Sequence, residues 1–169
     1  MAVTGRNGGA IAPLLVLLDT AYNKASWYGP NLRGSLRGVS PEAAAWRPQP
    51  DAHNVWELLV HAAYWKYVAW RRLTGAARGS FPLEGSNFFE RPVEASAAAW
   101  CADLRLLDAM HRELRAAVAA TAPRALESRL LGSTVTRLRL IAGVAAHDIY
   151  HAGQIQLLKK QYSRRRAGR

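Results

Sequence analysis

Apolar side chains recur along this chain at intervals of three and four residues, the spacing of one face of an α-helix. Period-two alternation is missing and β-branched residues are scattered, so the pattern predicts no strand of any length. Four helical segments are expected: Ile11 to Gly38 with a break at Gly29-Pro30, Asn54 or Asp51 to about Thr74, about Val93 to Thr121, and Ser133 or Thr134 to about Tyr162. Four helices with two long connections predict an all-α four-helix bundle.

Glycine, proline and capping residues set the expected boundaries. Residues 1–10 are Gly-rich and predict a flexible N-terminus, residues 11–162 the bundle, and residues 163–169 a basic C-terminal tail. Pro30 suits the first turn of the piece that follows the break, because its missing N–H is unpaired there anyway. Ser40 to Asp51 predicts a helical turn followed by an extended connector, and Gly75 to Pro92 predicts a long loop.

The second and fourth predicted helices are apolar on two sides. Each of these helices has one apolar stripe that is expected to face the bundle. Further apolar positions lie on the opposite side of each helix: Leu59, Ala63 and Trp70 on the second helix, and Leu138, Ala142, Ala145, Ile149 and Gly153 on the fourth. A helix that is hydrophobic on two sides needs two partners. One bundle supplies one of them, so the pattern predicts a homodimer through these faces.

Histidines lie among the inward-facing apolar positions. His147 and His151 have i, i+4 spacing on one stripe with Val144 and Leu158, so both imidazoles share one helix face. A third imidazole from another helix would complete a set that leaves a metal coordination position open, as catalytic sites do. Spacing alone does not choose between His61 and His111 as that third ligand, since each lies on an apolar stripe.

Three polar residues near these histidines are candidates for supporting roles. Glu57 lies one turn before His61 and is a candidate second-shell partner, fourth ligand or base. Gln154 points the same way as the histidine pair and is a candidate contact for a bound water or ligand. Asp148 projects about 100° away from His147 and is expected to miss the metal.

Composition narrows the class of protein. The chain has 169 residues, half of them hydrophobic, which fits one globular domain, and no apolar run reaches membrane-spanning length. Cys101 is the lone cysteine, so a disulfide within the chain is ruled out and a cytoplasmic location is expected. The net charge is +11, but six of the last eleven residues are basic, and arginine outnumbers lysine nineteen to four. Codon bias explains that ratio better than a nucleic-acid footprint, so nucleic-acid binding is not expected.

Two strings carry a family resemblance. The fourth-helix string GVAAHDIYHAGQIQLLKK, together with NVWELLVHAAYWKYVAWRRL around His61, resembles the DinB/YfiT-like superfamily of metalloenzymes, and the similarity covers about residues 11–162. The resemblance implies a four-helix bundle, usually dimeric, with a divalent ion held by His61, His147 and His151, which leaves out His111. Zinc, nickel, iron and manganese all suit such a site. Tyr28 departs from the family pattern, because close relatives often carry histidine there.

The resemblance also implies a chemistry. Relatives with assigned reactions are thiol-dependent transferases and isomerases that use bacillithiol, mycothiol or similar low-molecular-weight thiols, which predicts an S-transferase acting on a small-molecule substrate. The alternatives are a metal-dependent hydrolase, in which Glu57 or another carboxylate would move the proton, and a non-catalytic metal-binding stress protein.

Overall fold

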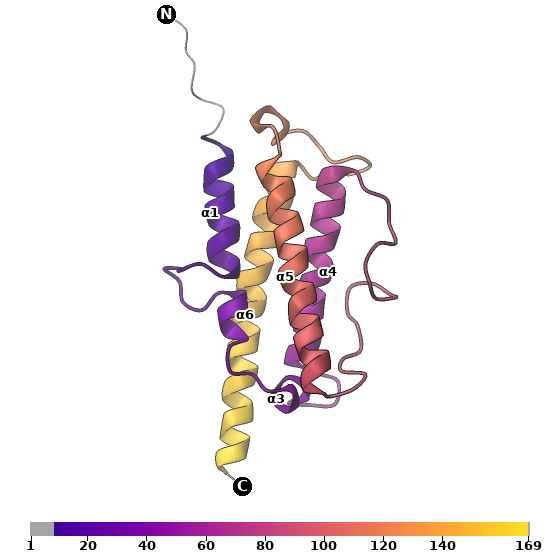
Figure 1. Ribbon diagram of the computed structural model, residues 1–169. Helices are drawn as coiled ribbons and strands as arrows, with labels where there is room; N and C mark the ends of the chain where they lie inside the picture. The colour runs from indigo at the N-terminus through magenta and orange to yellow at the C-terminus, as the bar shows by residue number, and fades with distance from the viewer. Residues whose placement is uncertain (1–8, 169) are drawn as a thin grey trace, which may run out of the picture.

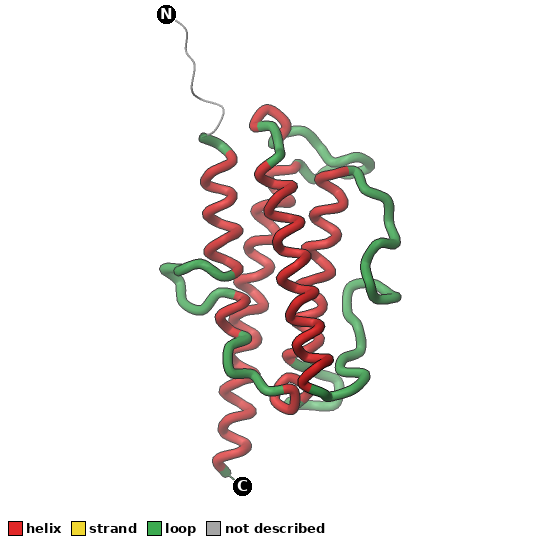
Figure 2. Tube along the Cα trace, in the orientation of Figure 1, coloured by secondary structure: helices red, strands yellow, loops and turns green. Residues whose placement is uncertain are grey.

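Every regular element in residues 9–168, the range that the computed structural model describes, is a helix (Figure 2). Residues 1–8 of the predicted flexible N-terminus lie outside that range. The helices are α1 (Ile11–Tyr22), α2 (Leu32–Ser35), α3 (Pro41–Ala45), α4 (Val55–Thr74), α5 (Ala97–Ala119), the 3-10 turn η1 (Pro123–Ala125) and α6 (Arg137–Ala167). The predicted all-α class is confirmed.

Side-chain caps begin α2 to α6, whereas α1 has none. At the start of α4 the Asn54 side chain accepts a hydrogen bond from the Glu57 N–H at 2.8 Å, and the Glu57 carboxylate accepts one from the Asn54 N–H at 3.4 Å. This reciprocal pair satisfies two of the N–H groups that a helix start leaves free. The same helix ends at Gly75, whose φ of +77° is a conformation that glycine adopts without strain.

Several predicted helix ends were wrong, because other capping groups set them. The first helix ends at Tyr22, and Pro30 precedes α2 rather than lying in its first turn, since Asn31 is the cap. Ser96 caps α5, which therefore begins at Ala97 instead of Val93. Thr136, not Ser133 or Thr134, caps α6.

The basic C-terminal segment continues α6. The helix runs to Ala167, past the predicted end near Tyr162, and its last part extends beyond the other helices (Figure 1). Arginines in its last turn interact favourably with the helix dipole. Lys159 attaches α6 to the end of α2, because its Nζ donates to the carbonyl oxygens of Ser35 and Arg37, both at 2.8 Å. Neither α6 nor any other helix in the described part of the chain is long and apolar enough to cross a membrane.

The helices α1, α4, α5 and α6 lie side by side and form the bundle (Figure 1). α4 contacts α5 and α6, and α1 contacts the same two helices, so α5 and α6 lie diagonally across from each other. α2 packs on α6, and α3 packs on α4. The predicted four-helix bundle is therefore the observed architecture, and it places the His61 helix directly against the helix that carries His147 and His151.

The bundle itself buries part of the second apolar faces. Leu59, Ala63 and Ala145 are fully buried within a single chain. They pack in two apolar clusters, one that contains Trp56 and Leu107 and one that contains Leu114, Leu18 and Ile141. Neighbouring helices of the same chain therefore bury these three positions, whereas Gly153 on the same face of α6 is exposed, and the predicted homodimer stays a prediction.

A group of polar side chains is buried between α1, α4, α5 and α6. Lys66 and Asp148 form an ion pair in which both side chains are fully buried. The Lys66 Nζ also lies 4.9 Å from the centroid of the Tyr22 ring, a cation–π contact. Tyr22 in turn stacks on His111 with ring centroids 3.7 Å apart and donates its hydroxyl proton to Asp108. His111 therefore belongs to this group, and it is not among the histidines His61, His147 and His151 that the structure brings together.

Acid stability should depend on His111. Burial lowers the pKa of His111 to about 3, and the positive charge of Lys66 adds to the effect. The unfolded chain takes up this proton near pH 6.5 and the folded chain only near pH 3, so folding stability falls as pH decreases through that window. His111→Phe keeps a ring against Tyr22 and should make the loss between pH 6 and pH 4 smaller by about 1 kcal/mol per pH unit. Urea unfolding at pH 6, 5 and 4 measures this, and parallel profiles for the two proteins would contradict it.

Candidate metal centre

Three histidines from two helices bring their imidazoles together. His61 on α4 and His151 on α6 are buried, and His147 is half-buried. The Nε2 atom of His147 lies 3.1 Å from Nε2 of His61 and 3.0 Å from Nε2 of His151. The i, i+4 spacing aligns the pair on α6, and the contact between α4 and α6 brings in the third ring.

Neighbouring acceptors fix how two of these rings present their nitrogens. The Nδ1–H of His61 donates to the carbonyl oxygen of Asn87 at 2.8 Å, and the Nδ1–H of His151 donates to Oε1 of Gln154 at 2.6 Å. In a neutral imidazole a protonated Nδ1 leaves a lone pair on Nε2. Both Nε2 lone pairs therefore face the centre of the cluster, an arrangement typical of metal-binding histidines.

The cluster is electrically neutral at neutral pH. Burial lowers the pKa of His147 to about 3 and that of His151 to about 4, and it lowers the pKa of His61 as well. Each additional positive ring would also repel the others. Neutral imidazoles are the form that binds metal ions, so no proton has to be displaced from these rings at pH 7.

The separations fit a single ion. In a tetrahedral site with metal–nitrogen bonds of about 2.1 Å, two ligand nitrogens lie about 3.4 Å apart. The two Nε2 separations at His147 are a few tenths of an ångström shorter than that. Side-chain nitrogens of all three residues lie within 4.8 Å of one another. The donor set is therefore one that a divalent ion fits, with at least one position left for another ligand.

Neither predicted carboxylate reaches the histidine cluster. The Glu57 carboxylate binds Arg47 through both oxygens and also lies 3.0 Å from Nδ1 of His53. Burial alone would raise the pKa of Glu57, but these partners hold it below its usual value. Asp148 misses the cluster as predicted, because it pairs with Lys66. The structure thus brings Gln154 to the histidines and leaves Glu57 bound to Arg47 and His53.

The loop between α4 and α5 supplies two residues that the sequence analysis missed. Asn87 has a φ of +65°, and besides its carbonyl contact with His61 it accepts a hydrogen bond from Trp65 Nε1 at 3.0 Å. Phe88 is sandwiched between two imidazoles, 4.0 Å from the ring of His61 and 3.7 Å from the ring of His53. No periodic pattern marks residues in such a loop, so only the three-dimensional structure identifies them.

A cavity of about 570 Å³ opens onto the three histidines. Its wall is largely apolar and includes Leu58, Phe88, Leu157 and Leu158. The polar side chains of the wall include Gln154, Gln161, Tyr150 and His53. Among the described residues, no Asp, Glu, Lys or Arg lines this cavity. The cavity therefore suits a largely apolar ligand with one group that reaches the histidines.

Gln154 should contribute to metal affinity without being a ligand. Gln154→Leu keeps the approximate side-chain size but removes the acceptor for the His151 Nδ1–H. Loss of such a partner typically weakens metal binding about 10- to 100-fold. Competition with a chromogenic chelator measures the effect, and Gln161→Leu, at the wall of the same cavity, is the matched control. Equal affinities for both variants and the wild type would show that Gln154 does not position His151.

These features define a class of protein. An all-α bundle with a neutral three-histidine cluster beside an open cavity fits a metal-binding protein. A sequence model described as the DinB superfamily matches residues 28–155, which include all three histidines, so the chain belongs to the DinB superfamily. The resemblance found in the sequence is thereby confirmed. No curated protein and no solved structure matches the chain.

Proposed function

We propose that the protein is a metal-dependent S-transferase in which His61, His147 and His151 hold a divalent ion, with zinc, nickel, iron and manganese as the candidates. One observation carries this proposal: three neutral imidazoles converge on a cavity whose described wall has no carboxylate. A divalent ion supplies a Lewis acid that lowers the pKa of a thiol and keeps it as a thiolate at neutral pH. A thiolate needs no general base.

The chain's own residues would position and shield the reacting groups. Asn87 and Gln154 hold two of the imidazoles in place, and the apolar side chains of Phe88, Leu157 and Leu158 would pack against the apolar part of a substrate. During transfer a carbon–sulfur bond forms while the bond from that carbon to its leaving group breaks, and the leaving group departs with the electron pair. An electrophile with an apolar body suits the observed wall.

The hydrolase alternative receives less support from this geometry. Metal-assisted hydrolysis usually relies on a carboxylate or histidine that moves the proton of the attacking water. Glu57 is bound by Arg47, and Asp148 is bound by Lys66, so neither is free for that role. His53 lines the cavity and is the one further imidazole there.

Metal analysis and a conjugation assay test the proposal. Untagged protein should contain about one divalent ion per chain by mass spectrometry, and the metal-loaded form should accelerate reaction of a low-molecular-weight thiol with a chloronitroarene. Chelation and the His147→Ala substitution should both abolish that acceleration. Thiol-independent cleavage of a nitrophenyl ester would favour the hydrolase, and metal binding without either activity would favour a non-catalytic metal-binding protein.

The homodimer is a second part of the proposal. Large apolar side chains that one chain leaves exposed include Val16 on α1 and Tyr150 and Leu157 on α6, each more than half exposed. In the proposed dimer, a second copy of the chain would cover these side chains. Sedimentation of the wild type as a monomer at micromolar concentration would contradict it.

A further inference from the structure

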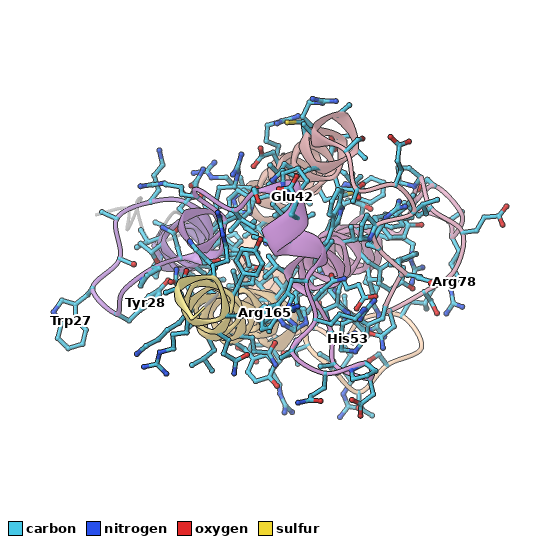
Figure 3. All side chains as sticks on the ribbon, turned by 90° about the horizontal axis from the view of Figure 1, so that it is seen from below. Trp27, Tyr28, Glu42, His53, Arg78 and Arg165 are labelled. Atoms are coloured by element: carbon cyan, nitrogen blue, oxygen red, sulfur yellow. The ribbon has the colours of Figure 1, made fainter. Side chains whose placement is uncertain are left out.

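A second and larger cavity, of about 730 Å³, lies between α4 and the loop that follows it. Two kinds of side chain dominate its lining: the arginines Arg71, Arg72 and Arg78, and the aromatic residues Tyr64, Trp65, Tyr67 and Phe81. Arg71 and Arg72 come from the last turn of α4, and Arg78 comes from the outer loop seen at the edge of the bundle in Figure 3. We call this the arginine cavity. It contains none of the three clustered histidines.

The guanidinium groups of the arginine cavity have no partner among the described residues. Four other arginines of the described chain do pair with carboxylates, namely Arg33 with Asp108, Arg47 with Glu57, Arg91 with Asp103, and Arg115 with Asp19. Arg71, Arg72 and Arg78 form no such ion pair within residues 9–168. Glu84 is the one acidic side chain of the lining, so positive charge is in excess there.

Tyr67 adds a further donor to the lining. Its hydroxyl oxygen accepts hydrogen bonds from the Gly79 N–H at 3.2 Å, the Ser80 N–H at 3.3 Å and the Ser80 hydroxyl at 3.4 Å. The oxygen is the acceptor in all three contacts, so the hydroxyl proton of Tyr67 can still donate a hydrogen bond. The hydrogen bonds from Ser80 and the nearby charge of Arg71 lower the pKa of Tyr67, as expected in a positive environment.

The aromatic residues give the same cavity a surface for a flat apolar group. Phe81 lies 5.4 Å from the Tyr67 ring and 5.3 Å from the Tyr64 ring, centroid to centroid. Planar groups stack on such rings, and guanidinium groups bind carboxylate and phosphate oxygens in pairs of hydrogen bonds. The neutral wall of the histidine cavity offers no comparable cation. The two cavities therefore suit ligands of different charge.

We propose that the arginine cavity is a binding site for a small organic anion, a carboxylate or phosphate ester with a flat apolar body. The unpaired arginines and the Tyr67 hydroxyl would hold the anionic group, and the aromatic side chains would hold the body. This site is separate from the metal-centred function. Trp65 stands between them, because it lines the arginine cavity while its ring lies 6.3 Å from the rings of both His61 and His147.

Calorimetric titration of chelator-treated protein tests the site without any contribution from a metal ion. Benzoate and phenyl phosphate should bind at least about tenfold more tightly than benzyl alcohol, which has the same ring and no charge. Arg71→Gln and Arg78→Gln should each weaken binding of the two anions by about tenfold and leave benzyl alcohol unchanged. Comparison of the two anions shows whether carboxylate or phosphate is preferred.

Arg105→Gln is the matched control, because it removes the same charge from an exposed position of α5 that does not line the arginine cavity. It should leave the affinity of both anions unchanged. Equal binding of benzoate and benzyl alcohol, or equal losses in Arg71→Gln and Arg105→Gln, would overturn the proposal. Displacement of phenyl phosphate by a short oligothymidylate at lower concentration would also overturn it, in favour of a nucleic-acid site. None of these outcomes depends on metal loading or transferase activity, so the two proposals can fail separately.

Discussion

Replacing His61, His147 or His151 with alanine is expected to abolish stoichiometric binding of a divalent ion in each case. The Nε2 atom of His147 lies at hydrogen-bonding distance from those of His61 and His151, and removing one ligand from a three-histidine site leaves only two protein ligands. Metal content after dialysis against a weak chelator measures the loss. The three variants should remain folded by circular dichroism, because a bundle with its own apolar core does not depend on one ion.

His111→Phe is the control for that experiment. It removes an imidazole from the core but leaves all three clustered histidines, so the variant should keep the full metal content. Loss of the ion in His111→Phe, with retention in His61→Ala, would show that the third ligand has been assigned to the wrong helix.

Lys66→Met is expected to reduce the free energy of unfolding at pH 7 by about 3–5 kcal/mol. Its partner Asp148 is fully buried, and one of its carboxylate oxygens, Oδ1, already has no hydrogen-bond partner among the described residues. The substitution would leave an unpaired charge inside the bundle. The double variant Lys66→Met/Asp148→Leu removes both charges and should recover most of the loss, since apolar replacements of a buried ion pair are often tolerated. Urea denaturation of all three proteins measures both effects.

The loss in the free energy of unfolding caused by Lys66→Met should also depend on pH. Burial raises the pKa of Asp148, and Lys66 opposes that rise in the wild type. Without Lys66 the folded-state pKa of Asp148 lies well above the unfolded value of about 3.9. The protonated carboxyl group of Asp148 is therefore tolerated at low pH, and the folding stability of the variant decreases as pH rises and this group ionises. The difference from the wild type should therefore be smaller at pH 5 than at pH 7. A deficit that stays constant over this range would show that the charge of Asp148 is not its cause.

Local patterns in the sequence were sufficient to predict the bundle and two of the three clustered histidines. The spacing of His147 and His151 determines their relation within one helix, and caps such as Asn54 determine where a helix begins. The choice between His61 and His111 needed the packing of helices. α4 lies beside α6, whereas α5 lies diagonally across from it, so His111 contacts Tyr22 of α1 instead. Only the family resemblance indicated this arrangement in advance.

Other features depend on long-range contacts and have no local signature. Lys66 and Asp148 are 82 positions apart in the chain, and neither has a pattern that marks it as buried and paired. Asn87 and Phe88 lie in an irregular loop, where side-chain direction follows from the path of the backbone. Sequence periodicity also does not show how many neighbours a helix has, so it did not reveal that Leu59, Ala63 and Ala145 are buried within one chain.

Asn87 places the α4–α5 loop in contact with two binding sites, the histidine cluster and the arginine cavity. Its carbonyl group holds His61, while its side chain holds Trp65 at the wall of the arginine cavity. If occupation of that cavity changes how firmly the loop is held, the change must appear in the affinity of the histidines for an ion. Thermodynamic linkage then requires the reverse effect to be equal: the factor by which the anion alters metal affinity is the factor by which the metal alters anion affinity. Through Asn87, the affinity measured for one ligand would thus show whether the other ligand is bound.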